Sequence, residues 1–216
     1  MRKISFAANN FYHIYNRGVD KRLIFLDSED LLRFLKIMKI FNVTEPIGSV
    51  YEYSFKELGS SAPKLVNFVA YCLNQNHFHF ILEPLIENGI QKFMHRLSTG
   101  YTNYFNEKYK RSGSLFQGSY KAIHINTNDY LLHVSAYVNL NDKVHRERNK
   151  EWMKKFPFSS FLEYKSKEIK NQICEKVIIL EQFRSSQEYE KFALSSLKDI
   201  LRRRENEKEF KTLLLE

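Results

Sequence analysis

Two apolar strands predicted between residues 65 and 82 limit the possible fold more than any other feature of the chain. Residues 65–73 are almost continuously apolar, which is typical of a largely buried strand. Asn74-Gln75-Asn76 then forms a tight connection, and residues 77–82 read as the next strand, which Pro84 closes. Because the connection is so short, the two strands are expected to be antiparallel neighbours in one sheet.

Helical patterns precede and follow this pair of strands. Asp27 has the position of an N-cap, and apolar residues then recur at helical spacing over residues 31–41. A long amphipathic helix is predicted over residues 90–108. A third helix begins at a cap, Asn126 or Thr127, and runs to about residue 140.

Three more segments have strand character. Residues 11–15 read as a first strand, residues 50–55 as a weak strand before a turn over residues 59–63, and residues 115–125 as an extended segment. The strong elements follow the order strand, helix, strand, strand, helix, strand. This order predicts an α+β fold, with a ferredoxin-like or RRM-like antiparallel sheet and helices on one face.

The last third of the chain is more charged than the rest and is predicted to be helical. Residues 156–161 form an apolar anchor, and residues 188–204 are predicted as an amphipathic helix that ends in three consecutive arginines. We found no repeat and no Pro/Ser-rich linker. The sequence therefore predicts one body, residues 1–145, followed by a basic helical C-terminal extension, residues 146–216.

The charge balance favours a polyanionic partner. The 216 residues include 34 Lys and Arg against 25 Asp and Glu, which gives a net charge of +9. Basic side chains that neutralise phosphates release counterions, and some of the 13 tyrosines and 18 phenylalanines can stack on unpaired bases. On charge alone, a basic globular protein without such a partner stays an open alternative.

Membrane and secretory signals are missing from the sequence. No apolar run is long enough for a transmembrane helix, and the N-terminus lacks the apolar region of a signal peptide. Cys72 and Cys174 lie far apart and form neither a metal-type pair nor a disulfide framework. This cysteine usage fits a reducing cytoplasm.

His77-Phe78-His79 is the first candidate for chemistry. Alternation along a strand puts His77 and His79 on one face, and puts Phe78 on the opposite, core-facing side. Two imidazoles at this spacing can converge on one divalent metal ion. The alternative is two histidines on a half-exposed sheet face without a ligand.

Tyr137 is the second candidate. Asn141 follows it by four residues, so one continuous helix would place both on the same face. A tyrosine is a weak nucleophile at neutral pH, but it becomes useful against a metal-bound phosphodiester. A packed helix tyrosine is the alternative, and Tyr101, Tyr104 and Tyr130 are equally plausible on local grounds.

Residues 111–122 are the third candidate, because they mix glycine and serine with Arg111, Lys121 and aromatic residues. Glycines allow close approach of a backbone, and the cations can reach phosphates. An ordinary turn followed by an edge strand explains the same composition.

Taken together, these segments resemble the single-tyrosine HUH transposases of insertion sequences and their chromosomal relatives, the REP-associated tyrosine transposases. The resemblance is carried by residues 12–18, 24–27, 70–81, 113–122, 137–141, 156–160 and 180–183. It implies the HUH endonuclease fold for the body of the chain. It also implies metal-dependent cleavage and rejoining of single-stranded DNA.

The resemblance assigns roles to four residues. His77, His79 and Asn141 would hold Mg²⁺ or Mn²⁺, and Tyr137 would attack phosphorus to form a 5′-phosphotyrosine. The chain departs from the family pattern beside these residues. Asp142 stands where a proline is common, Asn139 where a histidine is common, and Asn74-Gln75 where Met-Pro is common.

The resemblance also implies a partner. Relatives recognise DNA hairpins beside the cleavage site and act as monomers or homodimers, so single-stranded or hairpin DNA is expected here, in a prokaryotic cytoplasm near the nucleoid. The candidate DNA contacts are Arg17, Lys21, Arg22, Arg111 and Lys121. Two other readings remain: a domesticated hairpin-binding protein without turnover, and an RRM-like RNA-binding protein with accidental histidines.

Overall fold

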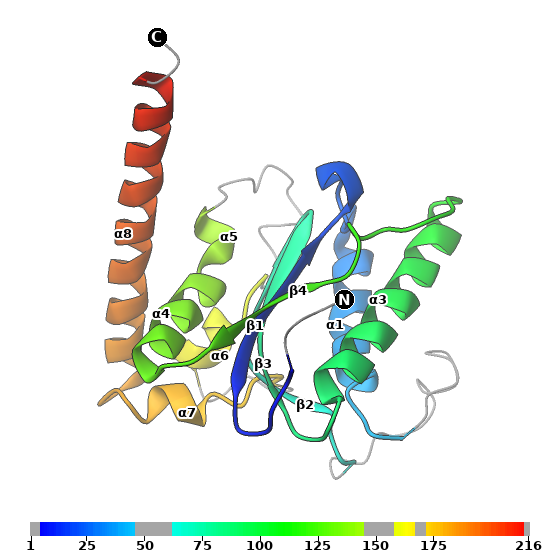
Figure 1. Ribbon diagram of the computed structural model, residues 1–216, viewed down its shortest axis with the longest axis horizontal. Coiled ribbons are helices and arrows are strands. Elements are labelled where there is room, and N and C mark those ends of the chain that lie inside the picture. The colour runs from blue at the N-terminus through cyan, green and yellow to red at the C-terminus, as the bar shows by residue number, and fades with distance from the viewer. Residues whose placement is uncertain (1–4, 46–61, 145–157, 167–171, 214–216) are drawn as a thin grey trace.

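One four-stranded antiparallel sheet organises the protein, with helices on both sides of it (Figure 1). The computed structural model describes residues 5–45, 62–144, 158–166 and 172–213. The strand order is β2-β3-β1-β4. The strands are β1 (Phe11–Arg17), β2 (Val66–Asn74), β3 (His77–Pro84) and β4 (Lys121–Ile125). This order, with the helices α1 and α3 in the two crossovers, confirms the predicted ferredoxin-like arrangement.

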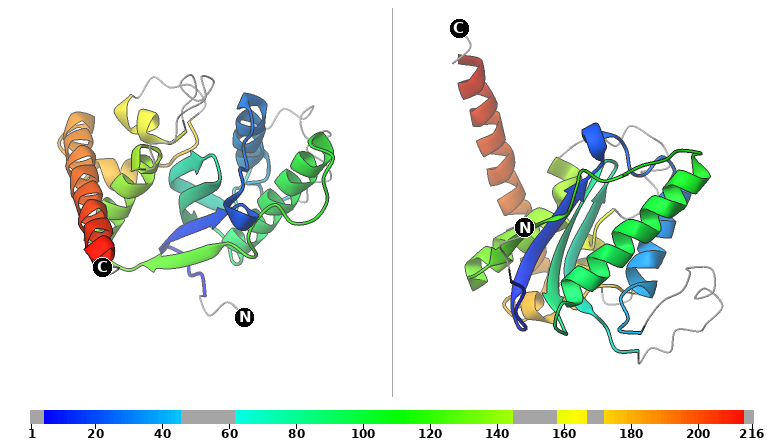
Figure 2. Two further views of the ribbon diagram at one scale, coloured as in Figure 1. Left: turned by 90° about the horizontal axis from the view of Figure 1, so that it is seen from above. Right: turned by 45° about the vertical axis from the view of Figure 1, so that its right-hand side comes forward.

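The first helical layer consists of α1 (Ser28–Ile40) and α3 (Gly89–Lys108). Asp27 caps α1 as predicted, since its side chain accepts a hydrogen bond from the backbone N–H of Asp30 at 2.9 Å. Both helices pack on the sheet face that carries Phe78 and Phe80, where their apolar residues form the larger of the two cores. The two views of Figure 2 show this layer on one side of the sheet.

A second helical layer covers part of the opposite face. It contains α4 (Asn128–Asn139), α5 (Asn141–Val144), α6 (Phe161–Lys165), α7 (Val177–Leu180) and α8 (Ser186–Leu213). Ile81 of β3 and Ala70 of β2 form a separate core with Val138 and Tyr189 from this layer. The prediction of helices on one face only is therefore wrong. The long apolar run of β2 explains the difference, because a strand that is covered on both faces is apolar on both.

β2 is an edge strand whose free edge is covered by residues from the C-terminal part. Leu73 donates its backbone N–H to the carbonyl of Phe158, and Ser160 donates to that of Tyr71. A bulge between Phe68 and Ala70 shifts the side-chain alternation by one residue. These contacts tie residues 158–160 to the sheet that carries the histidines.

Some predictions fall outside the described residues or differ from the structure. The weak strand at 50–55, the turn at 59–61, the domain boundary at 145/146 and the start of the 156–161 anchor lie outside the described residues. Strand β4 begins only at Lys121, because residues 115–120 form bends and an isolated bridge. Both cysteines are buried free thiols. No helix among the described residues is long and apolar enough to cross a membrane.

Candidate active site

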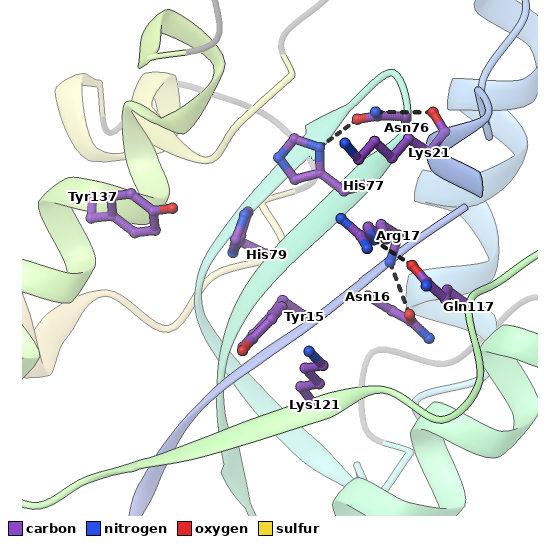
Figure 3. A pocket seen from close by; sticks show the side chains of 10 residues that line it. All are labelled: Tyr15, Asn16, Arg17, Lys21, Asn76, His77, His79, Gln117, Lys121 and Tyr137. Carbon is purple, nitrogen blue, oxygen red and sulfur yellow. Dashed lines mark hydrogen bonds between the residues drawn. The ribbon is translucent and has the colours of Figure 1, made fainter. Parts of the chain in front are cut away.

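A cleft of about 580 Å³ opens between the sheet and α4, on the face that carries the histidines (Figure 3). Its floor comes from β1, β3 and the start of β4, and Tyr137 of α4 forms one wall. The lining residues are Tyr15, Asn16, Arg17, Lys21, Asn76, His77, His79, Gln117, Lys121 and Tyr137. None of these ten residues is acidic, so the cleft suits an anion.

His77 and His79 share the cleft face of β3, as the alternation predicts, and their ring centroids lie 5.1 Å apart. In the antiparallel register His79 lies opposite Tyr15, and Tyr15 lies opposite Lys121 on its other side. Arg17 lies opposite His77. The strand pairing therefore brings the two histidines, an aromatic ring and two cations into one surface.

The hydrogen bonds of His77 define which of its ring nitrogens is available. Nδ1 lies 2.6 Å from the side-chain oxygen of Asn76, which can only accept, so Nδ1 carries the proton. Nε2 is then a lone-pair nitrogen, 3.0 Å from the amide nitrogen of Asn74 and 3.3 Å from Oδ1 of Asn141. Two atoms that can act as ligands of a cation, the imidazole nitrogen of His77 and the amide oxygen of Asn141, are thus already side by side.

Asn141 reaches this position in a different way from the one predicted. Helix α4 ends at Asn139, and Leu140 leaves helical geometry at φ −111° and ψ 10°, so Asn141 begins the short helix α5. The prediction that Tyr137 and Asn141 lie on one continuous helix is wrong. Asn141 is fully buried, its Oδ1 accepts from Asn74 at 2.8 Å, and its Nδ2 has no partner among the described residues.

Tyr137 stands with its ring edge towards the histidine face. Its ring centroid lies 5.5 Å from that of His79, with an interplanar angle of 79°. Among the four candidate tyrosines, Tyr137 is the one that lines the cleft. Tyr101 is buried in the opposite core and donates to a backbone carbonyl, Tyr104 donates to Asp30, and Tyr130 is exposed in the first turn of α4.

His13 is a part of the site that the sequence analysis missed. It lies on β1, is 7% exposed, and its Nε2 is 2.8 Å from Nδ1 of His79. Its ring is 6.1 Å from that of Tyr137. Burial lowers the pKa of His13 to about 4, so the imidazole is neutral at physiological pH. The alternation of His13 with Tyr15 in the first strand was the signal that could have found both residues.

Two of the three comparisons with known proteins gave a match. The family described as "Transposase IS200 like" matches residues 43–141, a segment that contains both histidines of β3, Tyr137 and Asn141. Over these residues, a little under half of the chain, the protein is similar to the IS200-like transposases. The solved structure of a REP-associated tyrosine transposase bound to a REP hairpin is similar at 15% identity and a TM-score of 0.48, and the match covers 76% of this chain and 82% of that chain. The comparison with curated proteins gave no match.

The side chains of the cleft include atoms that fit a divalent cation. The described residues contain no group of three or more His, Cys, Asp and Glu side chains arranged to hold a metal. Two imidazoles and one amide oxygen still form a suitable mixed set for Mn²⁺ or Mg²⁺, which accept oxygen and imidazole ligands and keep further positions for water or phosphate. Asn141 Oδ1 accepts a hydrogen bond from Asn74, whereas its buried Nδ2 has no partner among the described residues, so internal hydrogen bonds use this amide only in part.

The predicted DNA-contacting cations fall into two groups. Arg17, Lys21 and Lys121 line the cleft. Arg22 and Arg111 are not among the lining residues: Arg22 pairs with Asp20 at 3.4 Å, and Arg111 lies over the ring of Phe105 at 5.5 Å. Within the 111–122 segment, Gln117 joins the site through a 2.5 Å hydrogen bond from Arg17, and Gln117 was missed by the sequence analysis.

Proposed function

We propose that this protein cleaves and rejoins single-stranded DNA beside a hairpin, with Tyr137 as nucleophile and His77, His79 and Asn141 as ligands of Mg²⁺ or Mn²⁺. The observation that carries the proposal is the convergence of these four residues. The histidines come from β3, the tyrosine from α4 and the asparagine from α5, yet His77 Nε2 lies 3.3 Å from Asn141 Oδ1 and the rings of His79 and Tyr137 are 5.5 Å apart.

The ligand residues act by holding their donor atoms in place before DNA binds. His77 is fixed by its hydrogen bond to Asn76, and Asn141 is fully buried and bonded to Asn74. A bound divalent cation supplies positive charge to the scissile phosphate oxygens, which gain negative charge in the transition state. Preorganised ligands avoid the cost of reorganising during the reaction.

Tyr137 carries out the covalent step. Its phenol oxygen forms a bond to phosphorus, the bond from phosphorus to the 3′ oxygen breaks, and the tyrosine proton ends on the released 3′-hydroxyl. The product is a 5′-phosphotyrosine, which keeps the energy of the phosphodiester. A 3′-hydroxyl from another strand then attacks the same phosphorus, restores a phosphodiester and returns the proton to Tyr137.

The cleft residues give the DNA strand a defined course. Lys121, Tyr15 and His79 are neighbours across three strands, and Arg17 lies beside His77. The cations Lys121 on β4 and Arg17 on β1 suit backbone phosphates, and the ring of Tyr15 suits an unpaired base. We propose that the strand runs across the sheet at this row, with the scissile phosphate below Tyr137.

The two alternative hypotheses, an RRM-like RNA-binding protein and a domesticated hairpin binder, are separated by different observations. An RRM-like protein binds RNA on an open sheet face, whereas the described helices cover one face and part of the other. A domesticated binder without turnover would keep the same cleft and differ only in chemistry, so an assay of covalent chemistry separates it from a transposase.

The test is formation of a covalent protein–DNA adduct from a pool of hairpin oligonucleotides with single-stranded flanks. Wild-type protein should form the adduct with Mn²⁺ and not with excess chelator, as seen on a denaturing gel. Tyr137→Phe should abolish it, whereas Tyr15→Phe, which removes the other tyrosine hydroxyl of the cleft, should retain it. Salt-sensitive hairpin binding without any adduct would support the domesticated binder instead.

A further inference from the structure

His13 and His79 share one hydrogen bond, which fixes where their protons lie. His13 Nε2 and His79 Nδ1 are 2.8 Å apart, and both residues are 7% exposed. Two neutral imidazole nitrogens at this distance need one donor and one acceptor. The pair therefore has two possible arrangements, and they differ in which ring nitrogen of His79 is protonated.

Only one of these arrangements suits a metal ligand. If His79 donates from Nδ1, its Nε2 is unprotonated and can bind a cation through its lone pair. If His13 donates instead, the proton of His79 must sit on Nε2 and block that atom. His77 offers an internal comparison, because its Nδ1 is also the bonded atom, with Asn76 as the acceptor. Both histidines of β3 are thus held through Nδ1.

The neighbours of His13 suit a ring that stays in one position and accepts a hydrogen bond from His79. β1 pairs with β3 on one side and β4 on the other, and His13 lies opposite Ile81 in the first pairing and Ile123 in the second. The ring of His13 is stacked beside that of His79, with centroids 5.1 Å apart and an interplanar angle of 23°. The ring of Tyr137 meets both imidazoles edge-on.

We propose that His13 is a positioning residue: it accepts a hydrogen bond from His79 Nδ1 and so keeps His79 Nε2 unprotonated and aimed for the divalent cation. The inference rests on the proposed metal site. Outer partners of this kind commonly change metal affinity by roughly 10- to 100-fold when they are removed. His13 is therefore expected to set the affinity of the site without touching the metal or the DNA.

Two measurements test the proposal, and the first needs neither metal nor a variant. Side-chain ¹⁵N NMR of the metal-free wild-type protein reports which nitrogen of His79 carries the proton, and we expect Nδ1. The second is the dissociation constant for Mn²⁺ alone, measured by electron paramagnetic resonance of the free ion. His13→Phe should weaken Mn²⁺ binding about tenfold or more, and His13→Gln, whose amide oxygen can still accept, should restore it to within about threefold.

The control is His124→Phe. It removes an exposed imidazole on β4, the strand that pairs with β1, and should leave the Mn²⁺ affinity unchanged. The proposal is overturned if His79 is protonated on Nε2, if His13→Phe binds Mn²⁺ like wild type, or if His13→Gln is as weak as His13→Phe. Wild-type protein that binds no Mn²⁺ but has His79 protonated on Nδ1 would contradict the proposed function and leave the hydrogen-bond assignment standing.

Discussion

Removing the hydroxyl of Tyr189 tests how the helix that carries Tyr137 is held over the sheet. Tyr189 of α8 is fully buried, and its oxygen accepts a hydrogen bond from the amide of Asn139 at 2.7 Å. Asn139 in turn accepts from Ser160 at 2.5 Å. Burial raises the pKa of Tyr189 to about 12, so the group stays a neutral hydroxyl. This network joins α4 to α8 and to the segment that covers β2.

Tyr189→Phe leaves the amide N–H of Asn139 buried without that acceptor, which costs about 1–3 kcal/mol. Ser135, the other neighbour of the hydroxyl at 3.2 Å, keeps its bond to the carbonyl of Leu132 at 2.7 Å and adds little. We expect a loss of about 2 kcal/mol in the free energy of unfolding. With an m value of about 2–3 kcal/mol/M, the urea midpoint should fall by about 0.7–1 M.

The control for this prediction is Tyr130→Phe, which removes an exposed hydroxyl from the first turn of α4 and should change the free energy of unfolding by less than about 0.5 kcal/mol. A Tyr189→Phe variant that unfolds at the wild-type urea midpoint would refute the reasoning. It would mean that apolar packing alone fixes α4 on the sheet.

Two further predictions concern stability and DNA affinity. Lys108→Met removes the ammonium that lies 2.8 Å from the carboxylate of Asp27 and 3.0 Å from the fully buried carboxylate of Asp30. It should lower the free energy of unfolding by about 3 kcal/mol near neutral pH. Burial alone would raise the pKa of Asp27, but hydrogen bonds, first of all the one from Lys108, lower it. Asp27 is half-exposed, so it supplies only a part of this stabilisation, and that part is present above the unfolded pKa of about 3.9 and is lost as pH falls through the lower folded value. Urea unfolding should therefore show the difference in unfolding free energy between wild type and variant narrowing as the pH falls below about 5, and a difference that does not change with pH would contradict the assignment. Arg17→Ala and Lys121→Ala should each reduce the slope of log affinity against log salt for a labelled hairpin by about 0.7–0.9, whereas equal slopes for these variants and for Arg111→Ala, which lies outside the cleft, would contradict the DNA course.

Strand periodicity predicted the histidine face correctly because side chains of a strand alternate with a period of two. Once β3 was recognised, His77 and His79 had to share a face opposite Phe78, and the structure has them so. The same reasoning applied to β1 would have added His13 and Tyr15. Local pattern sufficed for this part of the site.

Local pattern did not suffice for the nucleophile. Tyr101, Tyr104, Tyr130 and Tyr137 all sit in predicted helices, and their differences arise from tertiary packing. Of these four tyrosines only Tyr137 lines the cleft, which its place along α4 and the packing of α4 on the sheet decide together. The family resemblance supplied this choice before the structure did.

Long-range contacts account for most of the other differences between the sequence-based predictions and the structure. Lys108 meets its acidic partners about 80 residues away in sequence, and Tyr189 meets Asn139 across 50 residues. No local spacing encodes such pairs. In the same way, charge alone could not tell that Arg17 lies in the cleft while Arg111 lies over an aromatic ring.

The most direct test of the central claim is to locate the DNA on the protein by peptide mass mapping of the Mn²⁺-dependent adduct. The account predicts a single modified peptide, with the DNA joined through its 5′ phosphate to Tyr137, a free 3′-hydroxyl on the released strand, and no adduct in excess chelator. An adduct on Tyr15, or one that persists with the metal removed, would contradict the assignment of nucleophile and metal site.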